Sequence, residues 1–311
     1  MNLVFIGTAR FGIPALEKLA SSAHRVLAVV TQPDRPRGRG LEVRPSPIKE
    51  KSTELGLHLY RPESVNEYEF LREIRALSPD AIVVVAYGQK LGEELLQLCR
   101  FCALNIHPSL LPRYRGPAPV ARAILNGERE TGVSVIKLVS RMDAGPVFGA
   151  VRVPIPPEAT TPELEDELSR RGAQLLLEVL DKMEKGQAVE TPQNEREATY
   201  ARKFERREGR VDWRKPARRI VDSVRALQPF PGAFTFHNRR RIILYKVRAE
   251  RSPARPSERP GTIVALQPNA FRVSCSDGFV DVLEVQPESR RRMPAEEFLR
   301  AAPLRPGDRL A

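Results

Sequence analysis

Two polar side chains that could do chemistry stand at the end of an apolar run, where a strand should leave a sheet. Asn105 and His107 are separated by one residue, and the period-2 alternation of a strand directs both to the same side. An amide and an imidazole would therefore share one cleft at the carboxyl edge of the sheet. Prolines at both ends of the following run, 108–112, restrict the exit path, which gives the rigidity that a positioned site requires.

A third polar group, the carboxylate of Asp143, lies in the glycine-bearing turn 141–145 between two expected strands. Such turns often carry functional residues, although Asp-Ala-Gly is also ordinary turn chemistry. Taken alone, His107 could be a buried histidine bonded to a backbone carbonyl, and Asn105 could be a capping residue. The three groups together favour a site.

Short apolar runs alternate with amphipathic segments over the first half of the chain, which predicts a parallel sheet covered on both faces. Ligands of such sheets bind outside the carboxyl ends of the strands. Two later strands and a long helix complete a Rossmann-like, mostly parallel α/β domain. The expected strands are 3–6, 26–30, 81–85, 103–106, 133–138 and 147–153, and the expected helices are 11–20, 48–55, 68–77 and 161–184.

The last third of the chain changes to closely spaced short strands, which suggest a small, OB-like β-barrel at the C-terminus. A helix at 217–227 precedes the strands 233–236, 241–247, 261–266, 271–275 and 279–285, with Asp277-Gly278 as a hairpin turn. Trp213 is expected in the core. The polar stretch before the helix indicates a linker. We predict a first domain over 1–188, a linker over 189–206 and a barrel domain over 207–311.

Two other motifs carry less weight. The turn 7–12 has glycine at both ends, but it lacks the following Lys-Ser/Thr and the spacing of a dinucleotide fingerprint, so a plain tight turn is favoured. Cys99-x-x-Cys102 has the spacing of redox and zinc sites, yet no second pair accompanies it, and we expect structural thiols. Because the cysteines are few and no apolar stretch approaches about 18 residues, we expect a soluble, cytoplasmic protein without a membrane segment.

The net charge of +12 comes from 51 basic and 39 acidic residues. All of the excess lies in residues 200–260, which hold 18 basic and 6 acidic residues, whereas the remainder balances at 33 against 33. A localised basic excess favours a polyanion such as nucleic acid. A solvated basic surface is the alternative, and charge alone does not choose between the two.

Three segments resemble the signature of the 10-formyltetrahydrofolate-dependent formyltransferases: Asn105-Ile-His-Pro-Ser-Leu-Leu-Pro112, Arg113-Tyr-Arg-Gly-Pro-Ala-Pro119 and Met142-Asp-Ala-Gly145. Residues 31–40 and the second domain resemble the branch of that family that acts on aminoacylated initiator tRNA. The resemblance covers nearly the whole chain. Ala9 and Pro108 depart from the family's usual residues, and a proline after the histidine is also similar to glycinamide ribonucleotide transformylase. The segment therefore identifies the folate chemistry better than the acceptor.

This resemblance implies transfer of a formyl group from 10-formyltetrahydrofolate, a co-substrate, to the α-amino group of methionyl initiator tRNA, with no metal. Asn105 would donate to the oxyanion, and His107 would assist the same oxygen and exchange protons. Asp143 would orient the imidazole and drive proton transfer through water. The catalytic and folate-binding residues would all belong to the domain over 1–188.

The resemblance also implies which other residues meet the two substrates. The folate site would take in Ser109, Leu110, Leu111 and Pro112, and its adjoining wall would be Val85, Ala86, Tyr87 and Gly88, for which a plain strand end and turn is the alternative.

The basic segment 34–49 is long for a strand-to-helix connection, and by resemblance it enters the tRNA acceptor stem, where arginines meet phosphates. A surface insertion is the alternative. The residues expected to bind tRNA are Arg35, Arg37, Arg39 and Arg44 in this segment and Arg239, Arg240 and Arg241 in the second domain.

Two rival functions stay open. The same chemistry could act on a small amine, such as an amino sugar or glycinamide ribonucleotide, but the basic loop and basic barrel argue against it. A nucleic-acid-binding module with an inactive enzyme domain is the other rival, and the presence of Asn105, His107 and Asp143 together argues against that. We expect a monomer whose partner is the aminoacylated initiator tRNA.

Overall fold

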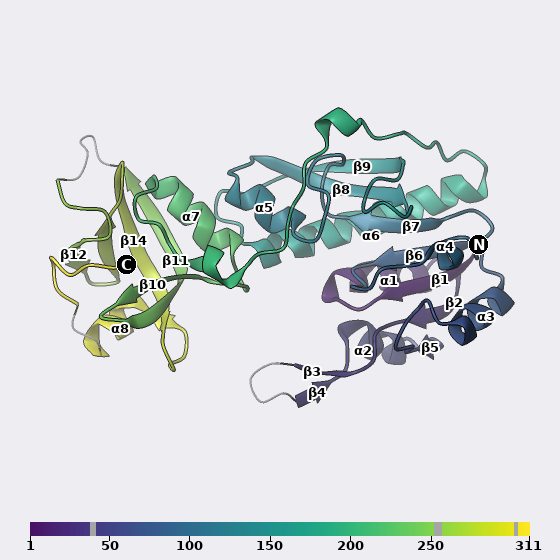
Figure 1. Ribbon diagram of the computed structural model, residues 1–311, viewed down its shortest axis with the longest axis horizontal. Coiled ribbons are helices and arrows are strands. Elements are labelled where there is room, and N and C mark those ends of the chain that lie inside the picture. The colour runs from purple at the N-terminus through teal and green to yellow at the C-terminus, as the bar shows by residue number, and fades with distance from the viewer. Residues whose placement is uncertain (38–41, 252–256, 302–303) are drawn as a thin grey trace. The chain divides into compact units, whose positions relative to one another are not determined.

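The computed structural model describes residues 1–37, 42–251, 257–301 and 304–311 (Figure 1). The chain forms two compact units. The first comprises Met1–Pro119, Glu130–Pro154 and Glu165–Ala201, and the second comprises Val120–Arg129, Ile155–Leu164 and Arg202–Ala311. The boundaries 1–188, 189–206 and 207–311 stay a prediction, because only expression of the separate parts would test whether each folds on its own.

Seven strands form the sheet of the first unit, in the order β5-β2-β1-β6-β7-β8-β9. Their bounds are β1 (Asn2–Gly7), β2 (Arg25–Val30), β5 (Leu59–Tyr60), β6 (Ala81–Val85), β7 (Ala103–His107), β8 (Glu130–Lys137) and β9 (Val147–Pro154). The first five are parallel, and β8 and β9 are antiparallel to their neighbours. The expected Rossmann-like, mostly parallel sheet is confirmed.

The order of the strands also indicates where a ligand would bind. The chain runs outward from β1 to β2 and β5 and then crosses back to β6 on the other side of β1. The order therefore reverses between β1 and β6, and open α/β sheets bind ligands at the carboxyl ends of strands near such a reversal. The strand next to β6 is β7, which carries Asn105 and His107.

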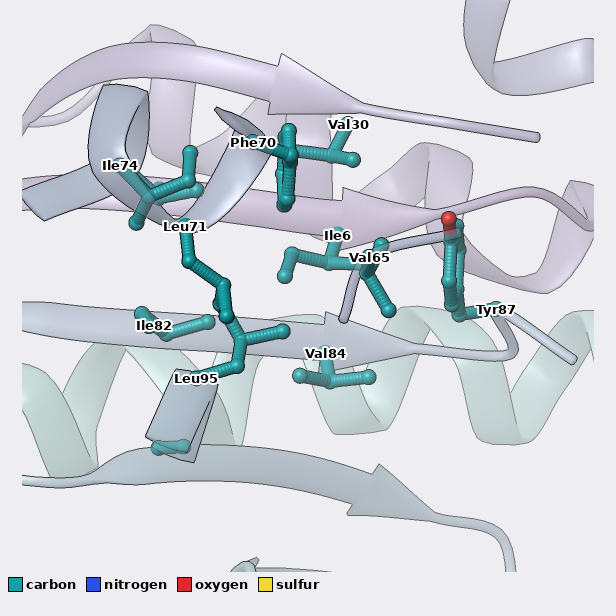
Figure 2. Close-up of a cluster of buried hydrophobic side chains, with 12 residues drawn as sticks. Ile6, Val30, Val65, Phe70, Leu71, Ile74, Ile82, Val84, Tyr87 and Leu95 are labelled. Atoms are coloured by element: carbon teal, nitrogen blue, oxygen red, sulfur yellow. The ribbon is translucent and has the colours of Figure 1, made fainter. Parts of the chain in front are cut away.

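Helices pack on both faces of this sheet. They are α1 (Ile13–Ala20), preceded by the 3-10 turn η1 (Arg10–Gly12), α2 (Pro47–Glu54), α3 (Tyr68–Leu77), the short α4 (Glu93–Leu96) and α6 (Thr161–Glu184). The helix expected over 11–20 thus begins later, with Pro14 in its first turn, where the missing N–H of proline costs nothing. Figure 2 shows Phe70, Leu71 and Ile74 of α3 packed against side chains of the sheet, all of them buried.

The long helix α6 lies against the strands that carry the polar groups. A Cβ at Gly172 would come within 2.6 Å of Ile106 and 3.0 Å of Val133, so this glycine lets the helix approach β7 and β8 closely. Strand β7 is therefore packed on its α6 face and hydrogen-bonded along both edges, to β6 and β8. A side chain on β7 has little freedom to move, since protein interiors are close-packed.

The second unit holds an antiparallel sheet in the order β10-β11-β14-β13-β12, with β15 paired to β14. The bounds are β10 (Ala233–His237), β11 (Arg240–Arg251), β12 (Ile263–Gln267), β13 (Ala270–Ser274), β14 (Gly278–Pro287) and β15 (Met293–Pro294), and the helices are α5 (Pro119–Leu125), α7 (Ala217–Ala226) and α8 (Ala295–Ala301). Trp213 is buried and donates to Thr235 at 3.1 Å, so it belongs to the core as expected.

The last residues of the chain close this sheet into a barrel. Phe236 of β10 exchanges both backbone hydrogen bonds with Ala311. At the other edge of the sheet, Leu310 bonds to Gly261, just before β12, and Asp308 bonds to Ile263, the first residue of β12. Both edge strands thus pair with the same segment, 307–311, which removes the exposed edges that open sheets present. The expected barrel is confirmed, whereas the way it closes was not predicted from the sequence.

Asp281 on β14 is a fully buried carboxylate in this barrel. Arg272 donates to it at 2.7 and 3.0 Å, and Arg248 donates at 3.2 Å. Burial raises the pKa of Asp281, but the hydrogen bonds from the two arginines outweigh burial, so its pKa is lowered. The group is therefore charged at neutral pH and holds three strands together.

Replacing Asp281 by Asn should lower the free energy of unfolding at pH 7 by about 1–3 kcal/mol, because it removes charge-assisted hydrogen bonds, while the partly exposed arginines left behind are solvated by water. Since the pKa is lower in the folded than in the unfolded state, this stabilisation is present above the unfolded pKa and is lost as the pH falls through the folded pKa. Urea unfolding at a series of pH values measures both effects. Glu258→Gln, at an exposed position, is the control, and equal stability of Asp281→Asn and the parent at pH 7 would contradict the assignment.

Candidate active site

The structure places Asn105 and His107 on one side of β7, at the carboxyl edge. Asn105 stands opposite Val84 of β6, and His107 stands opposite Ser134 of β8. Asn105 is half-buried, and none of the residues that the structure describes hydrogen-bonds to its side-chain amide. The amide is thus free to donate to a bound molecule.

His107 is buried, with 4% of its surface exposed, and both of its nitrogens have neighbours. Its Nε2 lies 2.9 Å from the carbonyl oxygen of Tyr114, and its Nδ1 lies 3.7 Å from Oδ2 of Asp143. Because a carbonyl can only accept, Nε2 carries the proton of the neutral ring, and Nδ1 faces the carboxylate. The histidine is therefore bonded to a backbone carbonyl, the alternative raised from the sequence, and it also lies beside a carboxylate; its part in a functional site stays a prediction.

Asp143 is held in a left-handed backbone conformation, with φ at +51°. Its Oδ2 accepts a hydrogen bond from the backbone N–H of Gly116 at 2.7 Å. Gly145 closes the same turn, and a Cβ there would overlap the carbonyl oxygen of Lys137. The turn therefore requires glycine at 145 and is fixed by the end of β8.

The loop after β7 is braced by two serines. The Ser109 hydroxyl donates to the carbonyl of Arg113 at 2.7 Å, while the Ser134 hydroxyl donates to the carbonyl of Ser109 at 2.8 Å and accepts from Leu111 N–H at 3.3 Å. Ser109 is fully buried, so its hydroxyl serves the loop itself. Leu110, Leu111 and Pro112 are half-buried.

The end of β6 lies beside the end of β7. Val85 and Tyr87 are buried, and Figure 2 shows Tyr87 among the side chains of the core cluster. Ala86 and Gly88 are exposed, with φ at +47° and +90°. Of the four residues expected to line a folate wall, these two small ones present their backbone at the surface.

Comparison with known proteins identifies the family to which this fold belongs. Residues 1–180 match the family described as formyl transferase, and residues 203–303 match the C-terminal domain of formyl transferases. The chain belongs to the formyl transferase family.

Similar proteins match this chain along nearly its whole length. The methionyl-tRNA formyltransferase of Moorella thermoacetica is 41% identical over 308 residues, covering 99% of this chain and 98% of the relative. That of Methylococcus capsulatus is 43% identical, covering 98% of each chain. Among solved structures, HypX from Aquifex aeolicus in complex with tetrahydrofolic acid is 22% identical with a TM-score of 0.63, covering 96% of this chain and 46% of HypX. An N-formyltransferase from Helicobacter canadensis, in complex with folinic acid and dTDP-3-aminofucose, is 17% identical with a TM-score of 0.69, covering 92% and 98%. These structural likenesses concern the fold.

The basic segment 34–49 of this formyl transferase contains a β-hairpin. Strands β3 (Arg35–Arg37) and β4 (Glu42–Arg44) pair antiparallel, with Arg35 opposite Arg44. Asp34 forms ion pairs with Lys49 and, at 3.2 Å, with Arg61, and the hydroxyls of Thr31 and Ser46 are bonded at 2.8 Å. The hairpin is thus braced at its base. Arg39 lies outside the described residues.

The three arginines expected to bind tRNA in the second unit differ in their surroundings. Arg239 lies in the two-residue turn between β10 and β11, with φ at +63°, and Arg239 and Arg240 are exposed. Arg241 is half-buried, and its guanidinium lies 4.2 Å from the centre of the Phe234 ring. Arg239 and Arg240 therefore present charge to solvent, whereas Arg241 packs on an aromatic face.

Cys99 and Cys102 lie shortly before the start of β7. Burial raises the pKa of Cys102 to about 12 and also raises the pKa of Cys99, so both are thiols that pack as small apolar groups, as expected. In the described part of the chain, no group of three or more His, Cys, Asp or Glu side chains could hold a metal ion. No described helix is both long enough and apolar enough to cross a membrane.

Arg115, Gln193 and Glu195 contact the Asp143 turn or each other, and no role for them was predicted from the sequence. Two of them lie in the stretch expected to be a linker. Polar residues in an aperiodic segment give no signal of such contacts, because their partners are about 50 to 80 positions away in sequence.

Gly145→Ala should destabilise this formyl transferase by about 2–3 kcal/mol, since the added methyl meets backbone that cannot move. Gly186→Ala is the matched control: Gly186 has φ at +69°, but a Cβ added there would meet nothing within 4 Å among the described residues, so only the conformational cost of about 1 kcal/mol applies. Denaturant unfolding of both variants measures the difference. Equal losses would show that the turn rearranges freely around residue 145.

Proposed function

We propose that this formyl transferase moves the formyl group of 10-formyltetrahydrofolate to the α-amino group of methionyl initiator tRNA, giving N-formylmethionyl-tRNA. The observation that carries the proposal is 41–43% identity over at least 98% of the chain to proteins named methionyl-tRNA formyltransferase. The amide, imidazole and carboxylate at the carboxyl edge of the sheet support the same chemistry.

The first requirement of the reaction is a donor for the oxyanion. A neutral amine attacks the formyl carbon, and negative charge develops on the formyl oxygen. The Asn105 amide, which has no partner among the described residues, can donate to that oxygen from a fixed strand. Such pre-organised donors act without reorganisation when the charge appears.

The second requirement is transfer of a proton. The attacking nitrogen gains positive charge and must lose a proton, while the folate nitrogen must gain one as its bond to the formyl carbon breaks. Nε2 of His107 is engaged by a carbonyl, so Nδ1 is the atom that takes the proton of the attacking amine. Once protonated, Nδ1 can donate to the formyl oxygen and then pass its proton to the folate nitrogen as the bond to the formyl carbon breaks. The nearby Asp143 carboxylate stabilises the charged imidazolium, because opposite charges at this separation attract.

The exposed backbone at the end of β6 is compatible with the folate. Ala86 and Gly88 leave room for a flat ring to approach the main chain, and a Cβ at Gly88 would come within 3.0 Å of Gln32 Nε2. Leu110, Leu111 and Pro112 would contribute apolar contact from the neighbouring loop. Ser109 and Tyr87 would act indirectly, since one braces the loop and the other fills the core.

Replacing Asn105 by Ala should lower kcat for formylation of methionyl-tRNA by about 10²–10³, the usual effect of losing one oxyanion donor. Asp143→Ala should lower kcat comparably, because the imidazolium loses its counter-charge. Asn269→Ala, at an exposed position in the second unit, is the control. Steady-state kinetics with 10-formyltetrahydrofolate measure the effect, with charged initiator tRNA, free methionine and an amino sugar as alternative acceptors. Variants within a few-fold of the parent would refute these roles.

For the tRNA we propose phosphate contacts from the braced hairpin and from Arg239 and Arg240 of the second unit. Phosphate neutralisation releases counterions, so kcat/KM for the tRNA should fall by an order of magnitude or more between about 50 and 200 mM salt. Arg44→Glu should lower kcat/KM and flatten this slope. Arg25→Glu is the matched control, because Arg25 is exposed at the start of β2, at the opposite edge of the sheet. A flat salt response of the parent, or equal effects of both variants, would count against this surface.

The protein is further proposed to act as a monomer in the cytoplasm. A net charge of +12 disfavours association of two copies, and charged initiator tRNA is found where proteins are synthesised. Sedimentation at several salt concentrations tests the oligomeric state.

A further inference from the structure

The stretch 191–201 is built into the first unit at both of its ends. Thr191 exchanges both backbone hydrogen bonds with Val147, at 2.8 and 2.9 Å. At the other end, Arg115 donates to the carbonyl of Thr199 at 2.8 Å and accepts from the N–H of Ala201 at 2.7 Å. These bonds lay the stretch alongside the start of β9 and alongside Arg115, which follows the loop after β7.

Between these anchors, the side chain of Gln193 reaches the turn that holds Asp143. Its Nε2 donates to the carbonyl oxygen of Asp143 at 2.8 Å and to that of Gly145 at 2.7 Å. One amide group thus uses both of its N–H bonds on the backbone of a single turn. By holding the carbonyls of Asp143 and Gly145 together, the Gln193 side chain fixes the backbone of this turn. The direction in which the Asp143 side chain leaves the turn is then fixed as well.

The orientation of this amide is set by Arg115. The guanidinium of Arg115 is fully buried, and its Nε and Nη2 donate to Oε1 of Gln193 at 3.1 and 2.8 Å. Because arginine only donates, the Gln193 oxygen must face it and the NH₂ must face the two carbonyls. The amide cannot flip without losing four hydrogen bonds.

Glu195 supplies the counter-charge for this buried guanidinium. It accepts from Arg115 at 3.1 and 2.8 Å, and this bonding raises the pKa of Arg115 and lowers that of Glu195. Glu195 also pairs with Arg141, at the start of the Asp143 turn, at 2.7 Å. Residues 193–195 therefore contact the turn at 141, 143 and 145.

The carboxylate of Asp143 is held by the neighbour of the same arginine. Gly116, next to Arg115, donates its N–H to Oδ2 of Asp143, the oxygen that lies 3.7 Å from Nδ1 of His107. The backbone of Asp143 is thus set by Gln193 and its side chain by Gly116, and Arg115 ties the two together. This arrangement holds a non-glycine residue at φ +51°, a conformation that such residues rarely adopt unaided.

We propose that Gln193 is a positioning residue that sets the Asp143 carboxylate against His107, with Arg115 and Glu195 orienting its amide. The inference rests on the proposed function, since it concerns how the proposed catalytic carboxylate is placed. The stretch that was expected to be a linker would therefore influence the rate of formyl transfer rather than the affinity for the substrates.

The test is a pair of Gln193 variants measured alone and combined with Asp143→Ala. Gln193→Glu keeps the shape but replaces both N–H donors by a carboxylate oxygen, and Gln193→Met removes the bonds without adding charge. Each should lower kcat by about 10- to 100-fold, the scale of a misplaced catalytic group, with KM for folate and tRNA within about threefold of the parent. In the Asp143→Ala background the same substitutions should change kcat less than twofold, because their effect passes through Asp143.

A second readout does not depend on activity. The chain has four histidines, so the imidazole NMR signals of His107 can be assigned from a His107→Ala spectrum. Gln193→Met should shift these signals in the direction that Asp143→Ala shifts them, whereas Gln187→Met, at an exposed position in the same region, should leave kcat and the signals unchanged.

The outcomes separate the two proposals. If the parent does not formylate methionyl-tRNA but the His107 signals move as expected, the proposed function fails and the positioning role stands. Unchanged kcat and His107 signals in both Gln193 variants would overturn the positioning role. So would an equal loss of kcat with and without the Asp143 carboxylate, because the side chain would then act by another route.

Discussion

The separation of 3.7 Å between His107 Nδ1 and Asp143 Oδ2 is the constraint on which the rest of the site depends. The two groups come from chain segments with different mechanical properties. His107 stands on β7, which is bonded to strands on both sides and packed against α6. Asp143 stands in a turn, where backbone is held only by what touches it. The strand supplies the fixed reference, and the hydrogen bonds to Gly116 and Gln193 bring the turn to it.

The sequence predicted those features of the fold that the periodicity of apolar residues controls. Alternation along β7 placed Asn105 and His107 on one side, and the expected helix 161–184 coincides with α6. Both successes follow from local rules, since burial repeats every second residue in strands and every three to four in helices. The roles of Asn105, His107 and Asp143 are functional and remain predictions, whereas their placement at one edge is an observation.

What the sequence did not predict depends on contacts between distant residues. The hydroxyl of Ser109 is taken up by the loop, and the side chain of Tyr87 fills the core, although the family resemblance places both in the folate site. A motif gives the identity of a residue but not the direction of its side chain. Closure of the barrel by residues 307–311 and the contacts of Gln193 involve backbone groups, which every sequence has and no composition distinguishes.

The positive charge of the second unit is partly neutralised by ion pairs within the fold. Several of its arginines are neutralised within the fold: Arg122 pairs with Glu208, Arg225 with Asp222, and Arg248 and Arg272 with Asp281. A paired arginine contributes little to the potential that a polyanion meets, because its field is cancelled nearby. The net count already subtracts acids such as Asp222, so the ion pairs decide which arginines stay open to phosphate, and these lie at exposed positions such as Arg239 and Arg240. In the proposed function, acceptor choice would depend on where unpaired charge reaches solvent, whereas formyl transfer would depend on the geometry of one sheet edge.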